Sequence, residues 1–152
     1  MNLFNRLFRR KPQDVQPERI NACIATMDTY LRGIMSHYGM EHFQGDSQAK
    51  QVLSVYSFGG TSTLAMQQQL TQPQAHAVCL VLFTNFFGYK PAEATARAEA
   101  VITAIPDRTS HLYAIIHRGA DGFIHWQRHS DDGAARDFAT VMAEIQKAGE
   151  KG

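Results

Sequence analysis

Two histidines, His125 and His129, lie four positions apart, a spacing that would place both imidazoles on one face of a helix. Paired imidazoles can bind a transition metal, and Asp131 or Asp132 could supply a third ligand. The residues between the histidines lack the glutamate of a HExxH motif and include the positive Arg128, whose charge opposes a cation. We therefore expect no metal site here and interpret the histidines as solvated side chains.

The sequence also contains no motif for nucleophilic catalysis or for phosphate binding. Cys23 and Cys79 both lie in apolar helical patterns without a CxxC partner, which is typical of small buried residues. No serine stands in a GxSxG elbow. The pair Gly59-Gly60 precedes three hydroxyl residues, but neither GxxxxGK[ST] nor GxGxxG is present, so we interpret the pair as a helix break. The sequence predicts no catalytic residue and no cofactor.

One cluster is typical of a protein-binding surface, because Trp and Arg are enriched at the energetic centres of interfaces. The predicted partner-binding residues are Arg118, His125, Trp126, Arg128 and His129.

The charge distribution disfavours nucleic acid as the partner. Four of the 15 basic residues fall in the first eleven positions, so the remainder carries 11 basic and 14 acidic residues, a net of −3. A nucleic-acid-binding domain usually has a basic body. The predicted partner is therefore a protein.

The segment that must position these residues is the apolar run Ala75–Tyr89, AHAVCLVLFTNFFGY. A helix that is apolar on nearly every side must be surrounded by protein or lipid. The run is shorter than the roughly 18 apolar residues that a bilayer span needs. It predicts a buried central helix, about 72–87, and no stable membrane insertion. Thr71 and Gln74 form a capping box at its start, and Gly88 is placed to end it.

Before this helix, apolar residues at helical spacing predict a helix from Pro17 to Gly39, preceded by a connector over Lys11–Gln16. Residues Met40–Gly45 are predicted to form a loop, and Asp46 or Ser47 to cap the next helix. That helix should end at Gly59-Gly60 and be followed by a short one. That helix carries the apolar residues Val52, Leu53, Tyr56 and Phe58, and the short helix carries Leu64, Met66 and Leu70.

After it, Pro91 opens a helix that stops at Pro106. Its expected buried residues are Ala94, Ala98, Val101, Ile102 and Ile105. The segment 111–127 fits either one helix or a hairpin, LYAIIH–RGADG–FIHWQ, and the heptad-like apolar spacing favours the helix. Asp131 and Asp132 should cap a last helix with Phe138, Met142 and Ile145 facing inward.

These elements predict an all-α fold, a single bundle of about five to seven helices. Residues 1–16 are predicted to be a basic amphipathic arm, which could be disordered, residues 17–148 the helical domain, and residues 149–152 a ragged tail. The N-terminal residues MNLFNRLFRRKP lack the apolar core of a secretory signal, so we expect a cytoplasmic location.

The arrangement from Phe58 to Trp126 resembles a known family. It contains FGG before a short Gln-ending helix, a Thr-Gln-Pro-Gln entry to a very apolar helix, an Ala-rich helix after Pro91, and IIHRGADGFIHWQ. This arrangement is similar to small all-helical immunity proteins of bacterial toxin-delivery systems, such as those paired with polymorphic or type VI secreted effectors. The resemblance implies a protein that binds one cognate toxin and occludes its active site, without catalysis or cofactor.

Two alternatives remain open. One is an adaptor or chaperone-like module of a secretion system, which would use the basic segment Leu3–Lys11 for docking. The other is a metal-dependent or small-ligand enzyme built on His125, His129 and an aspartate.

Overall fold

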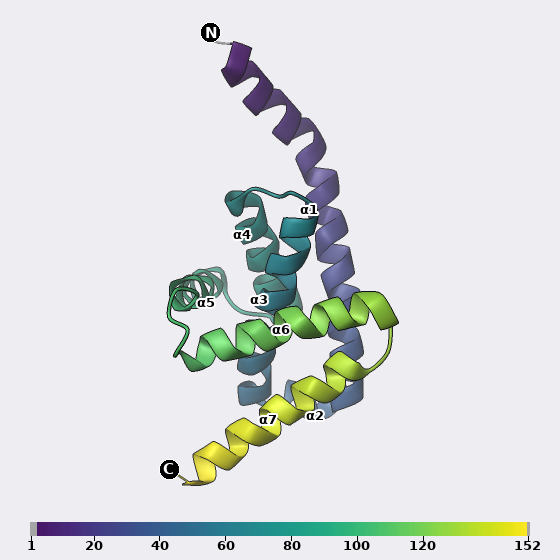
Figure 1. Ribbon diagram of the computed structural model, residues 1–152, viewed down its shortest axis with the longest axis vertical. Helices are drawn as coiled ribbons and strands as arrows, with labels where there is room; N and C mark the ends of the chain where they lie inside the picture. Colours follow the sequence, from purple (N-terminus) through teal and green to yellow (C-terminus); the bar gives the residue numbers. More distant parts are fainter. Residues whose placement is uncertain (1–2, 152) are drawn as a thin grey trace.

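The computed structural model describes the backbone of residues 3–151 and the side chains of residues 17–149. Over this backbone range the chain forms seven α-helices and one π-helical turn, with no strand (Figure 1). The predicted all-α bundle is confirmed. The elements are α1 Leu3–Tyr38, α2 Met40–Gln44, α3 Ser47–Gln67, α4 Gln72–Val81, the π-helical turn η1 Leu82–Phe86, α5 Pro91–Ala104, α6 His111–His129 and α7 Gly133–Lys151. None of the helices in the described range is long and apolar enough to cross a bilayer.

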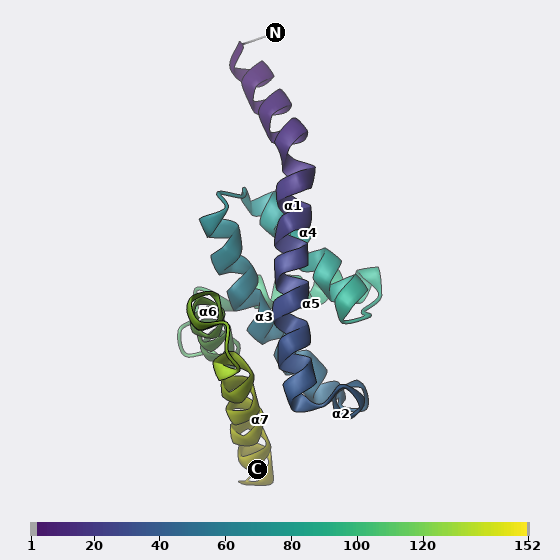
Figure 2. The same ribbon diagram turned by 90° about the vertical axis from the view of Figure 1, so that its right-hand side faces the viewer.

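Helix α1 ends where the sequence predicts, at Gly39, whose φ of 104° is strained for a residue with a side chain. Its start differs from the prediction. The helix continues through Lys11–Gln16, so the predicted connector is wrong at the level of the backbone. Figures 1 and 2 both show the first turns of α1 extending away from the other helices. The amphipathic side chains predicted for residues 1–16 lie outside the described side chains, and the division into arm and domain stays a prediction.

A short helix, α2, forms where a loop was predicted. Its Phe43 is 3% exposed. Burial of that ring in the core holds the segment between α1 and α3 in place.

Helix α3 is the centre of the bundle. Asp46 caps it as predicted, accepting a hydrogen bond from the backbone N–H of Ala49 at 3.0 Å. Twelve of its residues are buried, whereas α4 and η1 together bury four, so α3 takes the central position predicted for 72–87.

The predicted helix break at Gly59-Gly60 is wrong, because α3 runs through both glycines. Helix α6 lies across α3 at this point (Figure 1). A Cβ built on Gly59 would clash with the Ile116 carbonyl of α6 and lie 2.6 Å from the Ala120 nitrogen. The absence of side chains is what allows the two backbones to meet, and this close approach explains the glycines.

Helix α4 begins with the predicted capping box. The Thr71 hydroxyl accepts a hydrogen bond from the Gln74 N–H, and the Gln74 side chain accepts one from the Thr71 N–H. The helix widens into the π-helical turn η1, and Gly88, at φ 73°, follows its end. The buried residues of α4 and η1 are Val78, Cys79, Leu82 and Phe83.

Helix α5 buries Ala94, Ala98 and Val101 as predicted, but Ile102 and Ile105 are each 43% exposed. The buried stripe continues to Ala104 instead, so the predicted burial of the two isoleucines is wrong. They lie beside the stripe, because neighbouring positions on a helix point about 100° apart.

Residues 111–127 lie within one helix, α6, which excludes the hairpin alternative. Phe138 and Met142 of α7 are buried as predicted, and Ile145 is half-buried. The helix continues to Lys151, beyond the start of the predicted ragged tail, and Gly152 lies outside the described residues.

Candidate partner-binding surface at the turn between α6 and α7

The five predicted partner-binding residues all lie on α6, whose ends are defined by local signals. The Ser110 hydroxyl accepts a hydrogen bond from the Leu112 N–H at 3.1 Å and starts the helix. At the other end Ser130 adopts a left-handed conformation, φ 50°, and its N–H donates to the Trp126 carbonyl at 2.8 Å. The chain then turns sharply, and α7 doubles back beside α6 (Figure 1).

His125 and Asp131 join the two sides of this turn. Their Nε2 and Oδ1 atoms are 2.8 Å apart, and the same Asp131 oxygen accepts a hydrogen bond from the Gly133 N–H at 2.9 Å. The Gly133 hydrogen bond and, after it, the interaction with His125 lower the pKa of Asp131 below its ordinary value. The carboxylate is therefore ionised at neutral pH and fixes the start of α7.

Arg118 forms ion pairs with two carboxylates of α7. Its Nη2 donates to Asp137 Oδ1 at 2.6 Å and its Nη1 to Glu144 Oε2 at 2.7 Å. The other Asp137 oxygen accepts a hydrogen bond from the Tyr56 hydroxyl of α3 at 2.9 Å. These carboxylates raise the pKa of Arg118, with Asp137 contributing most. Arg118 thus holds α6 against α7, and its charge is largely balanced within the molecule.

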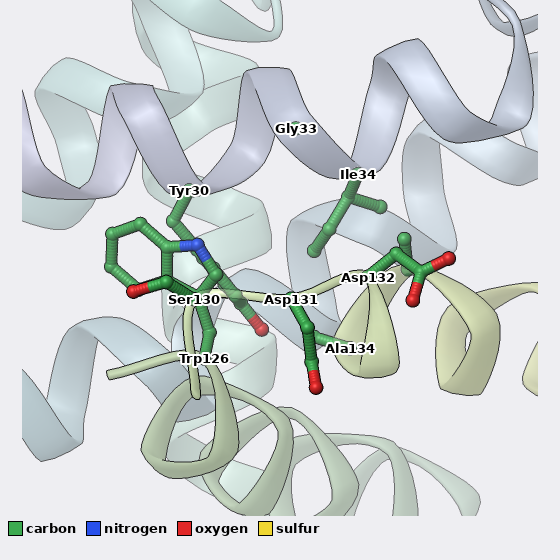
Figure 3. Close-up of a pocket in the computed structure, with 9 residues that line it drawn as sticks. Tyr30, Gly33, Ile34, Trp126, Ser130, Asp131, Asp132 and Ala134 are labelled. Carbon is green, nitrogen blue, oxygen red and sulfur yellow. The ribbon is translucent and has the colours of Figure 1, made fainter. Parts of the chain in front are cut away.

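Trp126 packs inward. Its ring centroid lies 5.2 Å from that of Tyr30 in α1 and 5.8 Å from that of Phe123. The indole lines a hollow of about 320 Å³ between α1 and the α6–α7 turn, with Trp126 and Ser130 at one end and Asp132 at the other (Figure 3). Trp126 therefore contributes both to the core and to an open wall that a partner could contact.

Arg128 and His129 are the two predicted residues that remain exposed at the end of α6. Within the described side chains neither forms an ion pair, although the His129 ring lies 4.5 Å from that of His125 between centroids. Next to them Asp132 binds Arg136 at 3.1 Å and lies 3.9 Å from His37. The turn thus presents a mixed surface of imidazole, guanidinium and carboxylate groups.

The metal-ligand arrangement considered for His125, His129 and an aspartate is not assembled. Among residues with described side chains, no group of three His, Cys, Asp or Glu residues is placed to hold a metal ion. His125 is instead hydrogen-bonded to Asp131, as described above.

Sequence reasoning missed the groups that anchor this surface: Tyr56, Asp137 and Glu144. Asp137 and Glu144 are seven positions apart, which places them on one face of α7, and that spacing is visible in the sequence. Which helix they face is not visible, since it depends on the tertiary arrangement.

The helical bundle and its hydrogen-bonded α6–α7 turn present a mixed polar surface of the kind that can bind another protein. Residues 19–146 match the family model described as Immunity protein 48. This match covers most of the 152 residues, and the chain belongs to the Immunity protein 48 family. It is therefore an immunity protein of a toxin system, as the resemblance found in the sequence implies. No curated protein and no solved structure matches the chain.

Proposed function

We propose that the chain neutralises one cognate protein toxin by one-to-one association that occludes the active site of the toxin. The observation that carries this proposal is the family match over residues 19–146, which runs from α1 to α7. Immunity by binding requires a stable surface and no chemistry of its own. A bundle whose polar side chains hold its helices together is suited to that task.

We place part of the contact surface at the exposed end of α6, with Arg128 and His129 as direct contacts and His125, Trp126 and Arg118 as supporting residues. Arg128 presents a guanidinium without an ion-pair partner among the described side chains, so a carboxylate of the toxin can bind it without displacing an internal partner. The net charge of −3 outside the first eleven residues favours a toxin with basic surface near its substrate site.

The test is co-expression with the cognate toxin, whose gene we expect to lie beside the gene of this chain in the native genome. Expressed alone the toxin should kill a bacterial host, and with this chain the host should survive. The purified pair should elute as a 1:1 complex, and toxin activity should fall linearly with added chain until the ratio reaches one. Survival without a complex, or a complex with full toxin activity, would contradict the proposal.

A pull-down from the native host provides an independent check with the full-length chain. Recovery of the same toxin at equal stoichiometry supports the proposal. Recovery of secretion-apparatus components without the toxin would favour the adaptor alternative.

A further inference from the structure

The hollow between α1 and the α6–α7 turn changes in chemistry from one end to the other. The indole of Trp126 lies at one end, and the carboxylate of Asp132 lies at the other (Figure 3). Between them the lining includes apolar side chains, such as Ile34 of α1 and Ala134 of α7. The hollow therefore combines an apolar wall with an acidic end.

The charged groups that line the hollow are both acidic. Asp131 and Asp132 line it, and no lysine, arginine or histidine does so among the described residues. Asp132 pairs with Arg136 through Oδ1, but both side chains of this pair are more than half exposed, and such pairs are weak. The Oδ2 atom of Asp132 lies 3.9 Å from His37 Nδ1, which is too far for a hydrogen bond. Asp132 therefore keeps one oxygen available as an acceptor.

A buried phenol in the same lining has no hydrogen-bond partner. Tyr30 is 1% exposed, and its hydroxyl forms no hydrogen bond with any described residue. The Tyr56 hydroxyl, which influences the pKa of Tyr30, donates its single proton to Asp137 and so is not a donor to Tyr30. In Figure 3 the Tyr30 side chain runs from α1 toward the space between Trp126 and Asp131. A buried polar group without a partner indicates that a partner is supplied from outside the chain.

Gly33 of α1 leaves the wall of the hollow open. A Cβ built on Gly33 meets nothing within 4 Å, whereas a Cβ on Gly59 or Gly119 would clash with a neighbouring helix. Packing within the described chain therefore does not require glycine at this helical position, where glycine is less stable than alanine. A side chain here would narrow the hollow, and its absence leaves room for a group from another molecule.

An arginine side chain has the same change of chemistry along its length. Its stem is apolar, and its guanidinium is charged, stacks on aromatic rings and carries several donors that can reach separate acceptors. Two carboxylates would repel an acidic side chain. An apolar side chain would leave Asp132 and the Tyr30 hydroxyl without partners. Charge complementarity therefore selects a basic occupant.

We propose that the hollow receives one arginine side chain of the cognate toxin, with its stem along Ile34 and Trp126 and its guanidinium donating to Asp132 and to the Tyr30 oxygen. This inference rests on the proposed function and names the toxin chemistry that the α6–α7 surface recognises. It also agrees with the net charge of −3 outside the first eleven residues.

The first experiment closes the hollow with Gly33→Leu in the full-length chain. The control is Gly149→Leu, because Gly149 is also helical and also has nothing within 4 Å of a built Cβ, but lies near the far end of α7. Binding to the toxin is measured by calorimetry, and thermal unfolding checks that each variant folds. Gly33→Leu should weaken binding at least about tenfold, whereas Gly149→Leu should change it less than about twofold, as is usual outside the energetic centre of an interface.

The second experiment removes the charge with Asp132→Asn, since asparagine is also well suited to the start of a helix. Asp28→Asn is the control, because Asp28 pairs with Arg32 four positions later, as Asp132 does with Arg136, but does not line the hollow. Asp132→Asn should weaken binding about fivefold or more and reduce its dependence on salt, because a charge-assisted contact is lost. Asp28→Asn should change binding less than about twofold.

The third experiment needs no variant of this chain, because Trp126 is its single tryptophan. Labelled with 5-fluorotryptophan, the chain should give one ¹⁹F resonance, which should shift when unlabelled toxin is added. Arg→Ala scanning of the toxin should then find one arginine whose loss is not additive with Asp132→Asn.

The outcomes separate the two proposals. Failure of the wild type to bind or inhibit the toxin overturns both. Wild-type binding with an unshifted ¹⁹F resonance, or with Gly33→Leu equal to wild type, overturns the occupied hollow and leaves the proposed function standing. Loss of binding in Gly33→Leu with normal binding in Asp132→Asn shows an uncharged occupant and overturns the inference. A toxin in which no arginine is coupled to Asp132 overturns it as well.

Discussion

Gly119 of α6 packs directly against the backbone of Tyr56 in α3, so that a Cβ on Gly119 would lie 2.8 Å from the Tyr56 carbonyl carbon. Gly59 meets the backbone of α6 in the same way from the opposite side. The two glycines together set the distance between the two helices that cross at the centre of the bundle.

Gly119→Ala should therefore destabilise the protein strongly. The clash is with backbone, which cannot rotate away, so we expect a loss of about 3 kcal/mol or more in the free energy of unfolding. Urea unfolding followed by circular dichroism measures this loss. Gly33→Ala is the matched control, because nothing lies within 4 Å of a Cβ at that helical position. It should leave stability unchanged or raise it by about 0.5–1 kcal/mol. Equal effects of both substitutions would refute the close crossing.

Asp137 should matter more for stability than Glu144, although Arg118 binds both. Asp137→Ala removes an acceptor from the Tyr56 hydroxyl as well as from Arg118, and we expect a loss of about 2 kcal/mol. Glu144 is 62% exposed, and its pair with Arg118 should contribute at most about 1 kcal/mol. Chemical denaturation of Asp137→Ala and Glu144→Ala tests the order. A larger loss for Glu144→Ala would contradict it.

The protein should lose stability at high pH. Burial raises the pKa of the Cys79 thiol from its ordinary value of 9.0 to about 12, and burial also raises the pKa values of Tyr30 and Tyr56. Each group is held neutral in the folded state but ionises earlier in the unfolded chain. Their contribution is complete below pH 9 and declines as the pH rises from about 9 towards 12. Unfolding free energies measured across that range should fall steadily.

The same burial makes the thiols unreactive. At pH 8 a chromogenic disulfide reagent should leave Cys23 and Cys79 unmodified in the native protein and label both in urea, because thiolate is the reactive species. Rapid native labelling of Cys79 would show that α4 does not pack as described.

Arg128 and His129 should affect binding without affecting folding, whereas Trp126 should affect both. Arg128→Ala combined with His129→Ala should weaken toxin binding about tenfold and leave the melting temperature unchanged, since both side chains are exposed. Trp126→Ala should lower the melting temperature by several degrees because the indole packs on Tyr30 and Phe123. A double variant that binds normally would remove the end of α6 from the interface.

Features determined by neighbouring residues could be predicted from the sequence. The Asp46 cap, the Thr71–Gln74 capping box and the end of α1 at Gly39 depend on residues within four positions of each other, and all three predictions are confirmed. The role of Gly59-Gly60 could not be predicted in this way. It depends on Gly119, and an isolated glycine pair is more typical of a break than of a crossing.

The candidate surfaces show the same limit. The composition of α6 indicated Arg118 and Trp126, but only the tertiary structure shows that α7 binds the first and α1 the second. Ile102 and Ile105 were predicted to be buried because they follow the helical period of α5. Periodicity alone does not distinguish apolar residues within a buried stripe from exposed apolar residues beside it. These two exposed isoleucines line a groove between α3, α4 and α5.

The crossing of α3 and α6 also bears on how quickly the chain can reach its native state. Gln67 and Gln127, whose side-chain amides bond across these two helices, are 60 positions apart, as are the two glycines at the crossing. Helical bundles usually fold fast because neighbouring helices pack first, but here the central contact requires a long loop to close. The closure entropy for such a loop opposes the step, so we expect slower refolding than in an up-and-down bundle of equal length.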